Sequence, residues 1–272
     1  MVSLTRTLSS VALAILLSMA TLLPSRLAAQ QNDTIIARTR EAISRGLAYL
    51  HHPSRILDAD AVLLYAYLKD RFDLAEISGS QSIIAQIKAD STSQLYMFLR
   101  LAEPRICEME FLDPNGPDDI SLTGIWYDEL EDIALLTDRI KATTWNWDEP
   151  YVITHALWAV AMAKHCFQAR LDTALERQLV EHNKQIMLRN RPLWNDVAIE
   201  ALAMAQYHDP TYVPPAEYIQ ELIELQNVYG SWNWEPRNIK TASQHTTVLA
   251  LWALLQYKPL AWPTKPRDMV VR

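Results

Sequence analysis

A tryptophan-rich loop followed by an apolar segment occurs twice in this chain, and this duplication constrains the fold more than any other feature. The first loop reads WNWDEP over residues 145–150, and the second reads WNWEP over residues 232–236. Each loop precedes a histidine near the start of an apolar segment, His155 in the first copy and His245 in the second. A repeated unit of loop and helix predicts stacked helix pairs, because one unit alone leaves its apolar face uncovered.

Apolar residues recur at helical spacing along most of the chain, which predicts an all-helical domain. Glycine is scarce, with 5 in 272 residues, and no segment gives a convincing strand pattern. Asp58 has the position and the residue type of a helix N-cap. We expect helices over residues 33–50, 59–68, 123–142, 151–169, 172–188, 195–207, 215–225 and 242–257, with less regular segments over residues 74–101.

The stretch from Gln226 to Pro236 contains Gly230 four residues after the glutamine and Trp232 two residues after the glycine. We expect Gly230 to take the left-handed conformation that ends a helix, and the Gln226 amide to bond exposed backbone groups beside the Trp232 ring. This spacing resembles the Gln-Trp repeat of the terpenoid cyclase and protein prenyltransferase superfamily. The resemblance implies an all-α fold, an incomplete α/α toroid of about five helix pairs.

The catalytic motifs of that superfamily are not matched. Its cyclases use an Asp-x-Asp-Asp motif, and the segment starting at Asp58 and Asp60 lacks the last aspartate, so helix capping explains the pair as well. The zinc site of the prenyltransferases uses Asp, Cys and His, but no cysteine lies near Asp196. The resemblance therefore implies a fold and not a reaction.

Equivalent loops of a toroid lie on one rim, which would bring the candidate site residues together. The candidate catalytic residues are His155, His245 and Asp196, and the candidate ligand-binding residues are Trp147, Asp148, Trp234 and Glu235. Histidine suits acid/base chemistry, and indoles with neighbouring carboxylates suit sugar rings. Alternatively, each histidine bonds a loop carbonyl, and the tryptophans fill gaps between helix pairs. A metal site would need a third ligand such as Glu200, so we assign no metal, and the cofactor stays unknown.

Residues 1–29 have the three parts of a secretory signal. Arg6 provides the positive start, residues 11–23 the apolar run, and the segment ending at Ala29 a small-residue cleavage site. The run has 13 residues, fewer than the ~20 of a membrane span. We expect cleavage, no stable membrane span afterwards, export to the periplasm or the cell exterior, and a single domain over residues 30–272. There, Cys107 and Cys166 would either form a disulfide or pack as small apolar residues.

The charge of the chain argues against one class of partner. Of 25 basic and 32 acidic residues, the signal contains two arginines and no acid, which leaves 23 basic residues and a net charge of −9. Such a surface repels phosphate backbones, so we expect no nucleic-acid partner.

Two classes of function stay open. The first is binding of a small apolar or carbohydrate-like ligand, or of an envelope protein, in the concave end of the toroid. The second is an enzyme. It would be either cyclase- or prenyltransferase-like, with Asp60 as the acid, or a polysaccharide lyase or hydrolase that uses His155, His245 and nearby carboxylates.

Overall fold

The computed structural model describes residues 33–90, 93–101, 133–143, 150–167, 172–191, 194–234 and 242–265. These residues are mostly helical, as the sequence predicts. The helices are the N-terminal helix (residues 33–50), α2 (Ala59–Phe72), α3 (Ser80–Ala89), α4 (Gln94–Met97), α7 (Ile133–Thr143), α8 (Pro150–Phe167), α9 (Thr173–Asn190), α10 (Asp196–His208), α11 (Ala216–Glu224) and α12 (Gln244–Leu255), with 3₁₀ turns η1 (Phe98–Leu101) and η3 (Lys258–Leu260).

One small sheet departs from the all-helical prediction. Strand β1 (Trp232–Asn233) pairs antiparallel with β2 (Ala242–Ser243). Each strand has two residues, too few for the alternating pattern by which a strand is recognised in a sequence. This strand pair holds the start of the tryptophan loop beside the start of α12.

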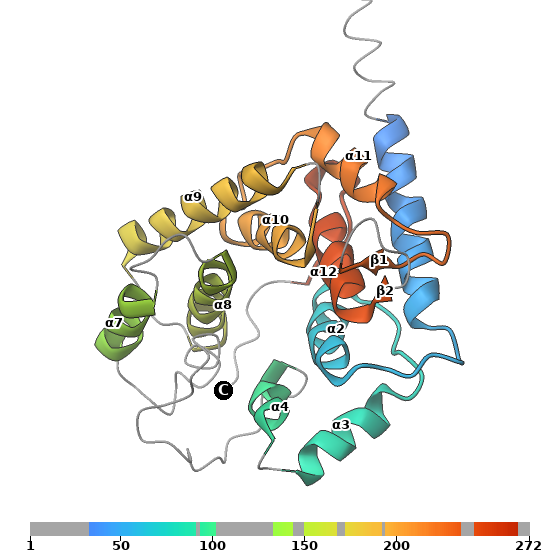
Figure 1. Cartoon of the computed structure of the whole chain (residues 1–272), viewed down its shortest axis with the longest axis horizontal. Helices are drawn as coiled ribbons and strands as arrows, with labels where there is room; N and C mark the ends of the chain where they lie inside the picture. The colour runs from blue at the N-terminus through green and yellow to red at the C-terminus, as the bar shows by residue number, and fades with distance from the viewer. Residues whose placement is uncertain are drawn as a thin grey trace, which may run out of the picture.

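The helices form two layers. The inner layer consists of α2, α12, α10 and α8, each packed against the next, while α9 lies outside α8 and α10 (Figure 1). Most of α10 and α12 is buried. The sequence explains this burial, because segments that are apolar all round are stable only when they are covered on every side.

The N-terminal ends of the inner helices lie at a common end of the molecule. Helices α8 and α10 both pack against α9, and their C-terminal residues Lys164 and His208 both contact Glu176 near the start of α9. They therefore run parallel to each other. The backbone N–H of Asp58, just before α2, donates to Gln244 Oε1 at the start of α12, with a distance of 3.1 Å.

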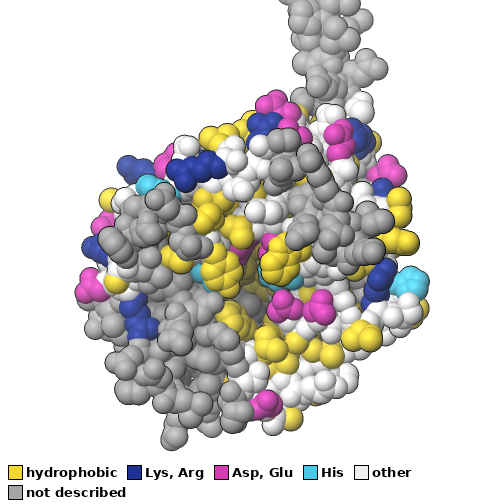
Figure 2. Space-filling view, in the orientation of Figure 1, with side chains coloured by type: hydrophobic (Ala, Val, Ile, Leu, Met, Phe, Trp, Pro, Cys, Tyr) yellow, Lys and Arg dark blue, Asp and Glu magenta, His cyan; other side chains and the backbone are white. Residues whose placement is uncertain are grey.

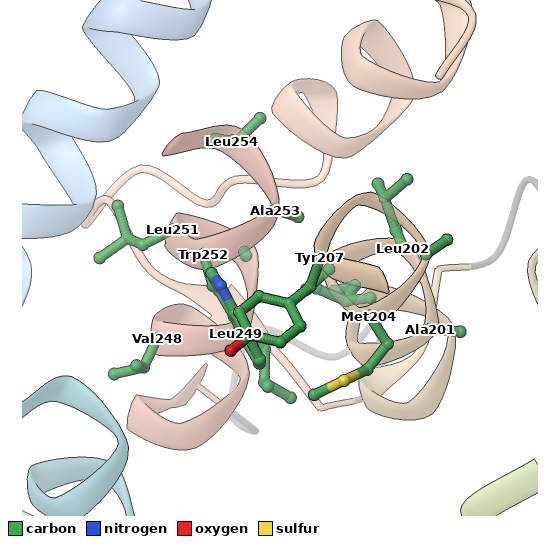
Figure 3. Close-up of a cluster of buried hydrophobic side chains, with 14 of the residues drawn as sticks. Ala201, Leu202, Met204, Tyr207, Val248, Leu249, Leu251, Trp252, Ala253 and Leu254 are labelled. Carbon is green, nitrogen blue, oxygen red and sulfur yellow. The ribbon is translucent and has the colours of Figure 1, made fainter. Parts of the chain in front are cut away.

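Aromatic rings from all four inner helices fill the space between them. Trp158 of α8 and Trp252 of α12 have ring centroids 4.8 Å apart, and Tyr67 of α2 lies 5.8 Å from each. Tyr207 of α10 lies beside Trp252, with centroids 5.7 Å apart (Figure 3). The Tyr67 hydroxyl donates to the Tyr207 hydroxyl at 3.0 Å. These four rings form an aromatic cluster between the inner helices.

The segment from Gln226 to Trp232, the Gln226 staple, joins the N-terminal helix to α11. Gln226 Nε2 donates to Ala42 O of the N-terminal helix and to Gly230 O, both at 2.8 Å. Gly230 has φ = 90°, as the sequence predicts. Trp232 is buried, and its Nε1 donates to Leu222 O of α11 at 2.7 Å. Trp232 thus fills a gap between helices, which confirms that interpretation for this residue.

Glu176 makes the stability of the fold depend on pH. Burial raises its pKa, but hydrogen bonds and charges from His208 and Lys164 outweigh burial and bring the pKa to about 2. Because this folded-state pKa lies below the ordinary 4.5, the carboxylate stabilises the fold above pH 4.5 and loses this effect as the pH falls toward 2.

Replacing Glu176→Gln is therefore expected to lower the free energy of unfolding at pH 7 by about 1–3 kcal/mol, with a smaller difference near pH 3. Urea unfolding at both pH values measures this. The matched control is Glu181→Gln, since Glu181 forms an exposed ion pair with Lys184 and should change stability by about 0.5 kcal/mol or less. Equal losses in the two variants at pH 7 would contradict the assignment.

Candidate functional site

A cavity of about 510 Å³ lies at the N-terminal ends of α2, α10 and α12. Its polar lining consists of Asp58, Asp60, Asp196, Ser243 and His245. Trp234, Ala59 and Leu95 add apolar surface. Figure 2 shows a hollow near the centre of this face, with acidic and histidine side chains beside it. The positive ends of three helix dipoles lie at this cavity, which favours carboxylates there.

His245 and Asp196 form a pair in the wall of this cavity. His245 Nδ1 lies 3.3 Å from Asp196 Oδ2, and the Thr246 hydroxyl donates to Asp196 Oδ1. The His245 side chain is 36% exposed, so the imidazole is held on one side and accessible on the other. The helix caps fix where Asp196 and His245 lie. The side-chain oxygen of Asn195 caps α10, and that of Ser243 caps α12. Asp196 follows its cap directly, and His245 is the second residue after Ser243.

The pair is ionised at neutral pH. Burial lowers the pKa of His245, but the hydrogen bond and charge of Asp196, with the charges of Glu200 and Asp60, raise it to about 9. Burial raises the pKa of Asp196, but His245 and the Thr246 hydroxyl outweigh burial, so this pKa is lowered overall. The cavity therefore contains an imidazolium that can donate and a carboxylate that can accept hydrogen bonds.

Asp58 and Asp60 form an acidic edge on the α2 side of the cavity. Asp58 occupies the N-cap position, as predicted, but its side chain accepts no capping hydrogen bond, so the capping explanation is wrong for this carboxylate. Partial burial raises the pKa of Asp58, the charge of Asp60 raises it further, and His245 lowers it. Asp60 is exposed, and its Oδ1 accepts from the Ala61 N–H at 2.8 Å. Asp60 thus lies at an open rim among polar groups.

Trp234 is the aromatic surface of the cavity. Trp234 is 66% exposed, whereas Trp232, two residues earlier, is buried. The two indoles therefore do not form one platform, because β1 holds Trp232 in the core and Trp234 follows the end of the strand. An exposed indole beside carboxylates presents a flat apolar face and polar partners together.

The structure separates His155 from the other candidate catalytic residues. His155 lies on α8 with its ring against Tyr151, at a centroid distance of 3.7 Å, and it does not line the cavity. Glu200, the possible third metal ligand, accepts a hydrogen bond from Nε1 of Trp158 in the aromatic cluster, at 2.9 Å. Within the described part of the chain, no three His, Cys, Asp or Glu residues are placed to hold a metal ion.

Several candidate residues lie outside the described ranges. These are Trp147, Asp148, Glu235 and Cys107, together with the signal segment over residues 1–29. Conversely, the sequence interpretation missed Ser243 and Leu95, which line the cavity. Ser243 could have been found as a cap before an apolar helix. No local pattern marks Leu95, because its place depends on how α4 packs.

Comparison with protein-family models, with curated proteins and with solved structures gave no match for this chain. In the residues that the structure describes, no helix is both long enough and apolar enough to cross a membrane.

Proposed function

We propose that this protein binds a carbohydrate-like ligand in the cavity between the starts of α2, α10 and α12. The observation that carries the proposal is the exposed Trp234 in one cavity with Asp58, Asp60, Asp196 and His245. Sugar rings combine apolar faces with many hydroxyl groups. An indole face can cover such a ring, while carboxylates accept and an imidazolium donates hydrogen bonds to its hydroxyls.

A polar ligand suits this cavity better than the small apolar ligand that the sequence also allows. Most of the lining residues carry charge or a hydroxyl group, and they would lose water contacts without replacement against a hydrocarbon. The exposed position of Asp60 likewise gives little support to a cyclase-like or prenyltransferase-like reaction. An envelope protein is the alternative partner, and it would be favoured if the wild-type protein bound no oligosaccharide.

A second candidate function is hydrolysis or lytic cleavage of a polysaccharide. It is favoured by two carboxyl groups of one cavity whose pKa values move apart, Asp58 upward and Asp196 downward. Such a difference is what one acid and one base require. In this variant of the proposal, Asp58 would donate a proton to the leaving oxygen of the glycosidic bond. Asp196, paired with His245, would accept a proton from the attacking water in hydrolysis or from the sugar ring in lytic cleavage.

The fold and location complete the proposal. The inner layer of α8, α10, α12 and α2 and the outer helices would be part of an incomplete α/α toroid, with the cavity at its concave end. The Gln226 staple, which joins the first helix of the described region to α11, supports this ring-like arrangement. The signal at residues 1–29 would deliver the protein to the periplasm or the cell exterior, where glycans occur.

A glycan array with neutral, amino and uronic oligosaccharides, followed by calorimetry on the bound compound, tests the function. Trp234→Ala is expected to weaken binding by about 10-fold or more and to leave the melting temperature unchanged, because the indole is largely exposed. The matched control is Tyr229→Ala, an exposed ring outside the cavity, which should bind as the wild type does.

Two results would refute the proposal. One is that the wild-type protein binds no oligosaccharide on the array, and the other is that Trp234→Ala binds as tightly as the wild type. Release of new reducing or unsaturated ends during incubation, lost in Asp58→Asn, would assign the second candidate function.

A further inference from the structure

We propose that the binding site continues along the rim to Tyr151 on α8, so that its ligand is an extended oligosaccharide and not a single sugar ring. This inference rests on the proposed function and specifies the length of the ligand. Trp234 would bind one part of the chain and Tyr151 another part.

Tyr151 lies at the same end of the molecule as the cavity. It belongs to the first turn of α8, which begins at Pro150. Because α8 and α10 run parallel, with their C-terminal residues meeting at Glu176, their first turns share the opposite end. The first turn of α10 contains Asp196, which lines the cavity.

The Tyr151 ring has the properties of a stacking surface. The residue is 51% exposed, although most large apolar residues of the described helices are buried. The His155 ring lies against one part of it, with centroids 3.7 Å apart and planes inclined by 38°. These residues are four apart on a helix and so share a face. This contact limits the rotation of Tyr151, and a ring that is already held loses less entropy when a ligand covers it.

The separation of the two aromatic residues sets the ligand length. Trp234 precedes α12, and α10 packs between α12 and α8. Neighbouring helix axes lie about 8–10 Å apart, so the starts of α12 and α8 are about 10–20 Å apart, depending on the curvature of the layer. This span exceeds one sugar ring. A chain that covers it would pass the start of α10, where Asp196 and His245 supply polar partners.

An oligosaccharide series tests this inference. We would measure the affinity for β-1,4-linked glucose and N-acetylglucosamine oligomers of one to six units, and for the matching series of any other array hit, by calorimetry. The wild type should bind longer oligomers more tightly until the span is filled. Tyr151→Ala should weaken binding of the longest oligomer by about 5–10-fold. Its affinity for the shortest oligomer that binds should equal that of the wild type. Trp234→Ala should weaken every length.

Two further variants keep the result interpretable. Tyr151→Phe keeps the ring and should bind as the wild type does, while Tyr151→Leu keeps apolar volume without a flat ring and should behave as Tyr151→Ala. Equal affinity of the wild type and Tyr151→Ala for the longest oligomer would overturn the extended site, even if Trp234→Ala loses binding. If the wild type binds no oligomer of any series, the proposed function itself fails, and the extended site fails with it.

Discussion

Replacing Gly230→Ala is expected to lower the free energy of unfolding by about 3 kcal/mol or more. Two independent costs add at this position. Gly230 has φ = 90°, a conformation that residues with a side chain rarely adopt. A Cβ atom there would lie 2.4 Å from the backbone oxygen of Arg45 in the N-terminal helix. Because this neighbour is backbone, relief of the clash requires the N-terminal helix to move away from the Gln226 staple.

Gly79 offers a matched control for this prediction. It also has a positive φ, 87°, but the nearest atom to its added Cβ would be Leu57 Cδ1, at 4.0 Å. Gly79→Ala therefore carries the conformational cost without the clash, and we expect a loss of about 1–2 kcal/mol. Urea unfolding of both variants measures the difference. Equal losses at the two glycines would contradict a close contact between Gly230 and the N-terminal helix.

Replacing Asp196→Asn is expected to lower the pKa of His245 from about 9 by about 1–3 units. The change removes the main charge that keeps the imidazole protonated, while burial still lowers its pKa. In the wild type the folded-state pKa of His245 exceeds the ordinary 6.5. Protonated His245 therefore stabilises the fold around pH 6.5, where Asp196 is ionised, and this effect is lost as the pH rises through 9. The variant should lack most of this pH dependence.

Nuclear magnetic resonance of the histidine ring protons measures the pKa directly, with His245→Gln to identify the signal. Asp60→Asn is the matched control, since Asp60 acts on His245 through its charge and makes no hydrogen bond to it, and the expected change is smaller. If the pKa of His245 stays near 9 in Asp196→Asn, then Asp196 does not keep the imidazole charged.

Much of the helical structure could be predicted from residue patterns. The segment expected over residues 195–207 is α10 (Asp196–His208), and the segment expected over residues 172–188 is α9 (Thr173–Asn190). These predictions succeed because helix period and caps are local properties. The left-handed Gly230 was predictable for the same reason. How the helices pack around the aromatic cluster depends on contacts between distant residues, which no local pattern encodes.

The candidate site was predictable in part. Asp196 and His245 do meet, as the expectation of a shared rim predicts, although 49 positions separate them, because both lie at the starts of the neighbouring helices α10 and α12. The same reasoning placed His155 beside them, but His155 packs on Tyr151 instead. The sequence predicts a helix cap for the carboxylate of Asp58, since an aspartate at a helix start usually has that role. Instead, this carboxylate makes no capping hydrogen bond and lines the cavity.

The most direct test of the carbohydrate site is a crystal structure of the protein with the oligosaccharide that binds most tightly on the array. We predict a sugar ring stacked on Trp234, with hydroxyl groups bonded to Asp58 or Asp196 and to His245. The proposed carbohydrate site would be contradicted by a sugar bound elsewhere on the surface, with only water in the cavity between α2, α10 and α12.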